Sequence, residues 1–452
     1  MTTDTPSMTD MFAMMQKLDM KAIARLSRHV DLPQLVEALG AMDPRDVARM
    51  LQRMGAPDNK PAPPVNGDFY EIAETLTEDE QTQLRLIRAF METEVRPISA
   101  EYWERGEFPK EILPGFAKLI GETLGMDEFR FPTPNPLLFG AALMEMARVD
   151  AAISTFVGVH WGLCMGSIVA FGSDEQKARF LPAMKRFEKI GSWALTEPEV
   201  GSATAAGLTT TARREGDTWV INGQKKWSGN ATFADVNIIW ARDLADNQVK
   251  GFIVEQGTSG YTVEKLQGKM ALRSVENVLI TLKDVRVAEA DRLPGVQSFR
   301  DVGRQLAAAR AGVGWKMTGV AMGAYERALE YANSRVQFGK PIANFQLVQN
   351  MLVQMLANLT AMQTMLLRLA QLEARDGTVS QERASLAKVF CGEKMRDVVA
   401  QARGLFGGNG ILLDYEVGRY FADAEALYSY EGTHEMNTLI VGRAITGKSA
   451  FV

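Results

Sequence analysis

The stretch TTTARREGDTWVING (residues 209–223) decides the fold class of this chain. Threonine and valine alternate along it with a period of two, and the dipeptides Gly216-Asp217 and Asn222-Gly223 favour tight turns. Further short runs of strand-forming residues follow at VNIIWAR (236–242), GFIVE (251–255), VLITL (278–282) and VRV (285–287). This alternation predicts a small antiparallel β-domain over residues 191–293.

Helical periodicity occupies both sides of this β-segment. On the N-terminal side, Thr77 and Glu80 have the spacing of a capping box, and apolar residues recur at helical intervals to about Lys189. Three runs on the C-terminal side have the length and spacing of bundle helices, at residues 302–336, 345–376 and 380–406. The order of helices, sheet and helices predicts an α+β fold.

The first 67 residues are predicted to form a separate extension. Apolar residues recur at helical spacing between Met11 and Met54, and APDNKPAPPVNGD (residues 56–68) has almost nothing to bury, which is typical of a linker. The predicted organisation has four parts: a helical extension with linker (1–67), an N-terminal helical domain (68–190), the middle β-domain (191–293) and a C-terminal four-helix-bundle domain (294–452).

The composition excludes several classes of protein. The formal net charge is -5, and lysine and arginine are interspersed with aspartate and glutamate, so no nucleic-acid partner is expected. Two cysteines, Cys164 and Cys391, and three histidines are too few for a disulfide framework or a metal site. The N-terminus is polar and no run of eighteen apolar residues occurs, so we expect a cytoplasmic protein without a signal peptide or membrane span.

Four groups of residues resemble known chemistry-bearing motifs. They are Leu195-Thr196-Glu197-Pro198 with Gly201-Ser202; Asn222-Gly223-Gln224-Lys225-Lys226-Trp227; Arg335-Val336-Gln337-Phe338-Gly339; and Gly407-Gly408-Asn409-Gly410 with Tyr430-Glu431-Gly432-Thr433. In this order, on the layout predicted above, they resemble the acyl-CoA dehydrogenase family. The resemblance covers residues 76–451 and is nearest to the glutaryl-CoA dehydrogenase branch and the plant short-chain acyl-CoA oxidases.

The resemblance implies an FAD-dependent enzyme that desaturates the Cα–Cβ bond of an acyl-CoA thioester. By resemblance, the catalytic base falls at Glu431. A carboxylate suits this role, since burial raises the pKa of a carboxyl group and makes it a stronger base. The family pattern also implies substrate contacts at Arg310, Tyr430 and Gly432, and an FAD contact at Thr433. From the residues alone, Glu431 is equally an ordinary turn residue that caps the next helix.

Other residues are implied to bind the flavin itself. By resemblance, Leu195 and Thr196 run beside the flavin ring, and Ser202 lies between the flavin and the pantetheine arm of the substrate. Trp227, followed by Ser228, matches the residue that walls the flavin ring. The alternatives are a strand that ends in a polar turn and a tryptophan of the core.

The last implied contacts reach the phosphates of FAD. Arg335, with Gln337 and Phe338, matches a segment whose arginine reaches the FAD pyrophosphate of a neighbouring subunit, a role that suits a planar guanidinium group. Gly407 and Gly408 would let the backbone approach the phosphates, although two glycines at a helix end are equally a C-cap.

The sequence departs from the family pattern at three positions. Gly229 replaces the threonine of most dehydrogenases, and we hypothesise that it leaves room near flavin N5 and admits oxygen. Ser154 stands where glutaryl-CoA enzymes carry an arginine for the distal carboxylate, so uncharged acyl chains are favoured. Ala203 replaces the usual aspartate after Gly-Ser. Nearby, His160 and Trp161 either shape the acyl pocket or belong to the core.

We therefore predict an acyl-CoA dehydrogenase that passes electrons to an electron-transfer flavoprotein. Two alternatives remain: an oxidase that reduces O2 to H2O2, and a catalytically silent module that binds FAD or acyl-CoA. Because Arg335 would complete the FAD site of a neighbour, a homotetramer or a dimer is expected.

Overall fold

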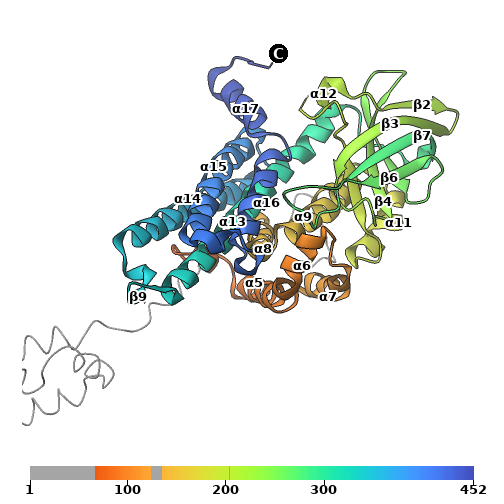
Figure 1. Ribbon diagram of the computed structural model, residues 1–452. Helices are drawn as coiled ribbons and strands as arrows, with labels where there is room; N and C mark the ends of the chain where they lie inside the picture. Colours follow the sequence, from red (N-terminus) through yellow and green to blue (C-terminus); the bar gives the residue numbers. More distant parts are fainter. Residues whose placement is uncertain (1–66, 124–134, 203, 452) are drawn as a thin grey trace, which may run out of the picture. The chain divides into compact units, whose positions relative to one another are not determined.

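The computed structural model describes residues 67–123, 135–202 and 204–451 of the chain. The helices predicted between Met11 and Met54, the linker up to residue 66 and the substitution at Ala203 lie outside these residues. In the described part, a group of helices is followed by a sheet and then by longer helices (Figure 1). The predicted α+β class is therefore confirmed.

The first group of helices begins at the predicted capping box. The Thr77 hydroxyl accepts a hydrogen bond from the Glu80 amide at 3.3 Å, and the Glu80 carboxylate accepts one from the Thr77 amide at 2.9 Å. The elements are η1 (Ile72–Thr75), α5 (Glu78–Phe90), η2 (Met91–Val95), α6 (Arg96–Arg105), η3 (Lys110–Ile112), α7 (Leu113–Thr123), α8 (Pro136–Val149), α9 (Ala151–Val157), η5 (Gly158–Met165), α10 (Gly166–Phe171) and α11 (Asp174–Lys185).

A wide helical turn interrupts the run from α9 to α10. The segment η5 is π-helical, with more residues per turn than an α-helix, and such turns occur frequently at functional sites. Within the described ranges, the run Ala151–Phe171 is the one helix long and apolar enough to cross a membrane, but 78% of its most apolar window is buried inside the protein. It therefore has the surroundings of a core helix.

The sheet contains strands of both directions. Its strands are β1 (Gly191–Ala194), β2 (Thr211–Glu215), β3 (Thr218–Ser228), β4 (Val236–Asp243), β5 (Val249–Glu255), β6 (Tyr261–Lys265) and β7 (Val278–Ala288). They lie in the order β1-β4-β2-β3-β7-β6, and β5 also pairs with β4. The purely antiparallel prediction is wrong at β4, which pairs in parallel with β1 and β2. Residue alternation reveals the period of a strand but not its direction.

The C-terminal part is a bundle around one long helix. The elements are α13 (Phe299–Ser334), the hairpin strands β8 (Val336–Gln337) and β9 (Lys340–Pro341), η7 (Ile342–Asn344), α14 (Gln346–Asp376), α15 (Gln381–Leu405), η8 (Gly407–Ile411), η9 (Leu413–Tyr415), α16 (Val417–Ser429) and α17 (His434–Thr446). Helix α13 packs against α8, α14, α15 and α16. The helices predicted at 302–336, 345–376 and 380–406 are α13, α14 and α15.

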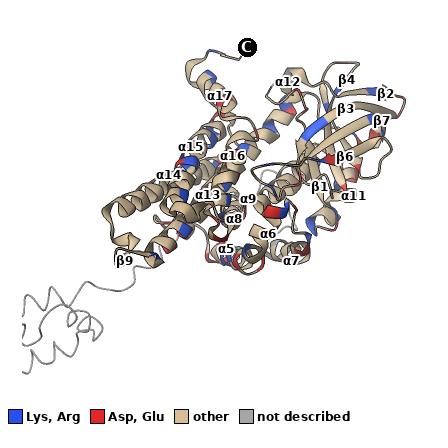
Figure 2. Cartoon of the chain, viewed as in Figure 1, with Lys and Arg blue, Asp and Glu red and all other residues tan. Residues whose placement is uncertain are grey.

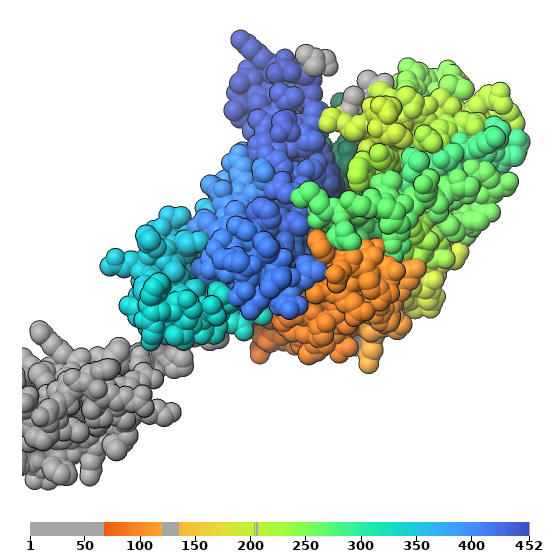
Figure 3. Space-filling model, viewed as in Figure 1, coloured from red at the N-terminus to blue at the C-terminus, as the bar shows by residue number. Residues whose placement is uncertain are grey.

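The three parts of the described chain pack against one another. In Figure 3 the first helices (orange), the sheet (green) and the bundle (blue) form one continuous surface. Figure 2 shows acidic and basic residues distributed over all three parts of the cartoon, as their interspersed order in the sequence predicts. A short helix, α12 (Thr204–Gly207), and the turn η6 (Glu289–Asp291) complete the elements.

Candidate active site

Glu431 lies in a strained turn between α16 and α17. Its φ is +54°, a left-handed conformation that costs a residue with a side chain about 1 kcal/mol or more. The Asn437 side chain and the Lys388 ammonium both donate to the Gly432 carbonyl, at 2.9 and 2.7 Å, and hold the turn in place. The hydroxyl that caps α17 belongs to Thr433, so the interpretation of Glu431 as the helix cap is wrong. Strain of this kind is typical of functional sites.

Burial and three nearby cations shift the pKa of Glu431 in opposite directions. Burial raises the pKa of its carboxyl above the ordinary value, whereas Lys316, Lys388 and Arg310 oppose the rise. The Glu431 Oε2 atom is shielded from solvent and has no hydrogen-bond partner among the described residues. A carboxyl group with a raised pKa and a free oxygen is suited to accept a proton from a ligand.

Glu431 forms part of the wall of a small cavity of about 70 Å³. One face of α13 supplies small side chains to this cavity, and the wide turn η5 supplies two glycines. The lining residues are Pro136, Phe139, Gly140, Leu143, Gly158, Gly162, Ala308, Ala309, Ala311, Gly312, Trp315, Lys316, Glu373 and Glu431. The cavity is mainly apolar, with charged groups at three positions, which is the general character of a small-molecule site.

Arg310 lies beside the same turn but outside that lining. Its side chain is buried, with 8% exposed, and atoms Nε and Nη1 have no partner among the described residues. A Cβ on Gly432 would be 3.8 Å from the guanidinium, so the two groups are near neighbours. Tyr430 packs against the core, and its ring lies 5.7 Å from the Lys316 ammonium. The four residues Arg310, Lys316, Lys388 and Glu431 are called the Glu431 cluster below.

The first two sequence motifs meet at the edge of the sheet. The Lys226 amide donates to the Thr196 carbonyl at 2.8 Å, and the Lys225 ammonium donates to the Leu195 carbonyl and to Glu197 at 3.0 and 2.9 Å. Burial alone would raise the pKa of Glu197, but Lys225 and two threonines lower it to about 2. Burial lowers the pKa of Lys225 to about 8. The buried ion pair between Lys225 and Glu197 thus joins the first motif to the second. No role was predicted for either residue.

The residues predicted beside the flavin differ in exposure. Trp227 is 53% exposed with a φ of +72°, so the interpretation as a core tryptophan is wrong. The Ser228 hydroxyl is buried and has no partner among the described residues, whereas Leu195 is buried and Ser202 exposed. An exposed aromatic face suits a planar ligand such as a flavin ring.

The residues predicted to contact the FAD phosphates lie in and beside the β8–β9 hairpin. Arg335, Gln337 and Phe338 are exposed in the β8–β9 hairpin, and Phe338 is 92% exposed. Figure 1 shows this hairpin far from β3, which carries Trp227. A single chain therefore does not bring the Arg335 group and Trp227 together.

The two glycines after α15, Gly407 and Gly408, lie at the same end of the bundle as the β8–β9 hairpin. An added Cβ on either Gly407 or Gly408 would meet no atom within 4 Å, so both leave open space beside the backbone. The adjacent Asn409 donates to the Tyr331 hydroxyl at 3.0 Å, near the end of α13 that leads into the hairpin. These glycines and Arg335 thus form a second group of predicted cofactor residues.

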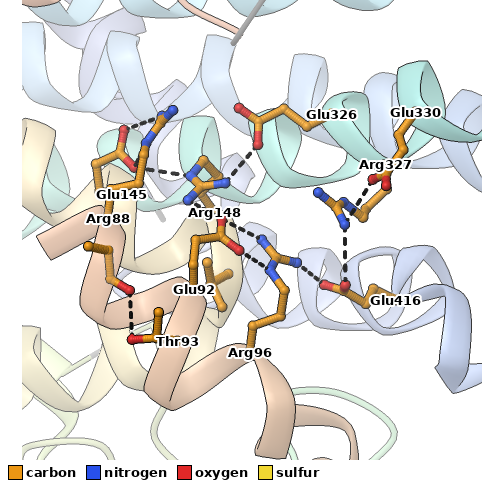
Figure 4. A network of polar contacts seen from close by, with 12 residues as sticks. Arg88, Glu92, Thr93, Arg96, Glu145, Arg148, Glu326, Arg327, Glu330 and Glu416 are labelled. Atoms are coloured by element: carbon orange, nitrogen blue, oxygen red, sulfur yellow. Dashed lines mark hydrogen bonds and ion pairs between the residues drawn. The ribbon is translucent and has the colours of Figure 1, made fainter. Parts of the chain in front are cut away.

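Arg148 is occupied in a closed ionic network (Figure 4). It donates to Glu145 at 3.0 Å, to Glu326 at 2.7 Å and to Glu92 at 2.5 Å. The members of this Arg148 network are Arg88, Glu92, Arg96, Glu145, Arg148, Glu326, Arg327 and Glu416. The following Ser154 is buried, and its hydroxyl donates to the Leu143 carbonyl at 2.8 Å. Neither Arg148 nor Ser154 belongs to the cavity lining.

His160 and Trp161 also lie outside the cavity lining. The His160 ring contacts the Met184 carbonyl at 3.0 Å and accepts from the Gly191 amide at 2.9 Å, and burial lowers its pKa to about 4. Trp161 is completely buried in the core. Both residues serve packing between the first helices and the sheet.

The sequence interpretation missed two cavity residues, Lys316 and Glu373. Lys316 was visible as a charged residue inside the otherwise apolar run GVGWKM (312–317), a position where a lysine needs a reason. Glu373 gave no such signal, because it follows Leu372 in a mixed, polar helix end. Burial raises the pKa of Glu373 to about 7.

Comparisons with known proteins agree with the fold and the motif order. Three family models match in succession: the N-terminal domain of acyl-CoA dehydrogenase at residues 77–188, its middle domain at 192–285 and its C-terminal domain at 299–446. An acyl-CoA dehydrogenase of Bacillus subtilis is 30% identical over 378 residues, which are 82% of this chain and 99% of the relative.

Solved structures give the same result. A glutaryl-CoA dehydrogenase from Mycobacterium smegmatis in complex with FADH2 has a TM-score of 0.81 and 33% identity, covering 85% of this chain and 98% of that one. A structure described as the electron transferring flavoprotein of Acidaminococcus fermentans has a TM-score of 0.77 and 27% identity, covering 82% and 99%.

Fold, motifs and relatives define an oxidoreductase that acts on acyl-CoA thioesters with a flavin cofactor. The chain belongs to the acyl-CoA dehydrogenase family. Its cofactor is FAD. The exposed face of Trp227 and the unpaired hydroxyl of Ser228 fit that group, because a flavin presents both a flat ring and polar edges.

Proposed function

We propose that this enzyme desaturates a short-chain acyl-CoA to the trans-2-enoyl-CoA, with Glu431 as the base that takes the α-proton. The observation that carries this proposal is the buried Glu431 carboxyl in the cavity wall, with a raised pKa and an oxygen that no described residue binds. The small cavity supports a short acyl chain.

The reaction breaks one C–H bond at Cα and one at Cβ and forms the double bond between them. The flavin, when bound, supplies the acceptor for the hydride that leaves Cβ. Glu431 takes the α-proton on a carboxylate oxygen, and its desolvated surroundings increase its basicity. The nearby cations Lys316, Lys388 and Arg310 oppose the rise in the pKa of Glu431 and favour the negative charge that develops at the thioester carbonyl.

We propose an electron-transfer flavoprotein as the acceptor, rather than oxygen. A Cβ on Gly229 would lie 3.3 Å from Val275 Cγ1 and 3.6 Å from Val159 Cγ2, so these valines already occupy the space that the glycine leaves. That packing argues against an open passage for oxygen at this position. The similarity to the Acidaminococcus structure named above supports the same choice.

We further propose that the working form is a homotetramer or a dimer. The support is the separation of the Arg335 group from Trp227, because a second chain is required to bring a pyrophosphate-binding arginine to the flavin site. Exposed Val336 and Phe338, at 53% and 92%, give the hairpin an apolar surface for such a contact.

The test is anaerobic mixing of the FAD-loaded protein with butyryl-, hexanoyl- and octanoyl-CoA while the visible flavin band is recorded. Bleaching with the short chains, followed by slow recovery in air and fast recovery with an electron-transfer flavoprotein, is expected. Fast recovery in air with H2O2 would instead identify an oxidase. If no thioester bleached the flavin, the protein would be a silent binding module.

A further inference from the structure

Lys316 is a buried lysine in the wall of the cavity. The side chain is 2% exposed and lines the same cavity as Glu431. A Cβ on Gly158 would lie 2.3 Å from the Lys316 Nζ atom, so the glycine of the wide turn η5 provides the space that the ammonium occupies. Lys316 is therefore held at the cavity wall, rather than extended toward solvent.

The Lys316 ammonium lacks hydrogen-bond acceptors. Over residues 67–123, 135–202 and 204–451, it forms no hydrogen bond and no ion pair, and only the Tyr430 ring, at 5.7 Å, and the field of Glu431 act on it. An ammonium group has three donors, and leaving them unpaired in a buried site is costly. By contrast, Lys388 of the same cluster donates to the carbonyls of Tyr428 and Gly432.

The charges around Glu431 do not balance. The Glu431 cluster holds three basic side chains, Arg310, Lys316 and Lys388, against the single carboxyl of Glu431. Of the three cations, Lys316 is the one that lines the cavity, where the other charged residues are Glu431 and Glu373. One cation is enough to neutralise the Glu431 carboxylate, and Lys388 already donates to the Gly432 carbonyl in the turn that carries Glu431. Lys316 is thus available to a ligand group that accepts hydrogen bonds.

The cavity extends from Lys316 along α13 toward Glu373. Gly314 packs against Leu366, which fixes the register of the antiparallel helices α13 and α14. Glu373, two turns beyond Leu366, therefore lies beside the turn of α13 that carries Ala308, roughly 12 Å from the level of Lys316 at 1.5 Å per residue. An acyl chain in this cavity passes between two polar ends, with apolar and small side chains along the walls.

We infer that Lys316 determines acyl-chain specificity by binding an oxygen atom carried on the chain, so that oxygen-bearing short acyl-CoAs are preferred over plain hydrocarbon chains. This inference rests on the proposed desaturation, because it takes the cavity beside Glu431 as the acyl site. The shared chemistry is a hydrogen-bond acceptor, supplied either by an ether or carbonyl oxygen or by a carboxylate.

The test compares chains of similar shape that differ in the acceptor. Hexanoyl-CoA, 4-methoxybutanoyl-CoA and 4-carboxybutanoyl-CoA are mixed anaerobically with the FAD-loaded enzyme, and kcat/KM for flavin bleaching is measured. Binding of the corresponding 3-thiaacyl-CoAs, which cannot be desaturated, is measured by calorimetry. The expected result is a preference of roughly 10- to 100-fold for one oxygen-bearing chain, the effect of one hydrogen bond to a charged group.

Three variants show whether Lys316 causes the preference. Lys316→Met should abolish it in both turnover and binding, whereas Lys316→Gln should keep it for the ether and lose it for the carboxylate, since an amide donates without charge. Lys283→Met, at an exposed position of β7, is the matched control and should behave as the wild type. Thermal unfolding of each variant identifies any loss of folding.

Two results would overturn the inference while the proposed function stands. One is equal turnover of hexanoyl-CoA and both oxygen-bearing chains by the wild type. The other is a Lys316→Met variant that slows all chains by one factor and moves only the pH profile, which would make the lysine a counter-ion of Glu431. Failure of every thioester to bleach the flavin would instead contradict the proposed function itself.

Discussion

The Arg148 network and the Glu431 cluster are both groups of buried or partly buried charges, but they differ in how their hydrogen bonds are used. In the network, Arg148 alone donates to three carboxylates (Figure 4). In the cluster, three cations face one carboxyl, and atoms of Glu431 and Arg310 have no partner within the described part of the chain.

The difference distinguishes a group of charges that stabilises the fold from a group that is available to bind a ligand. The Arg148 network ties α5, α8, α13 and the start of α16 together, and all three nitrogens of the Arg148 guanidinium already donate to carboxylates. An open cluster contributes little to folding, because its unpaired atoms are unfavourable until something binds them. Each prediction below changes one side of this comparison.

The largest effect is expected from Glu431→Gln. Loss of the base should reduce the rate of flavin bleaching by roughly 10²- to 10⁴-fold, while the unfolding midpoint stays equal or rises because a buried carboxyl is replaced by a neutral amide. Stopped-flow absorbance and thermal unfolding measure the two quantities. Glu435→Gln, on the exposed first turn of α17, is the matched control. Full turnover by Glu431→Gln would refute the assignment of the base.

The next largest effect is expected from Arg148→Met, in the closed network. This change leaves three buried or partly buried carboxylates without their shared donor and should lower the free energy of unfolding by about 3–5 kcal/mol. Denaturant titration measures it, and bleaching by the folded fraction should keep its rate. Adding Glu145→Gln should recover part of the loss. A stable single variant would show that the network is dispensable.

A change of pH optimum is expected from Arg310→Gln. Arg310 lowers the pKa of Glu431, so its removal raises that pKa further. The base acts when ionised, that is, above its pKa, and the rising limb of kcat/KM should therefore move to higher pH. Arg304→Gln, exposed on the same helix, serves as the control and should leave the profile unchanged. Movement of the limb to lower pH would contradict the stated sign.

The smallest effect is expected from Glu330→Gln, at the rim of the network. Glu330 is 64% exposed and pairs with Arg327 at 3.0 Å. Because exposed pairs contribute little, the free energy of unfolding should change by less than about 0.5 kcal/mol. The same denaturant titration measures it. If the free energy of unfolding fell as much as it does for Arg148→Met, the exposed ion pairs of the network would stabilise the fold as much as the buried ones.

The sequence predicted the α+β class, the capping box at Thr77 and the long bundle helices, because these depend on local periodicity and spacing. It could not predict the parallel pairing of β4, since strand direction depends on how the chain returns to the sheet. The same limit applied to the site. Glu431 and Trp227 were found because motifs carry them, and their assigned roles stay predictions.

Lys316 and Glu373 were missed because no motif contains them. Lys316 lies on α13 and Glu373 lies on α14. Both line the same cavity because of the way these two helices are aligned, which the packing of Gly314 against Leu366 sets. The Lys225–Glu197 pair was also overlooked, since its partners lie in different motifs and join only when β3 pairs with the Thr196 segment. Contacts between distant segments require coordinates.

Because η5 is a wide turn, the number of its residues decides which side chains line the cavity, as much as the identity of those residues does. Gly158 and Gly162 face the cavity because the turn between Gly158 and Met165 holds more residues than an α-helix would. Deleting one residue there would tighten the turn and rotate the remainder of the helix by about 100°. Such a deletion would bring different side chains to the cavity without substituting any of them, so the number of residues in η5 is itself a determinant of the cavity wall.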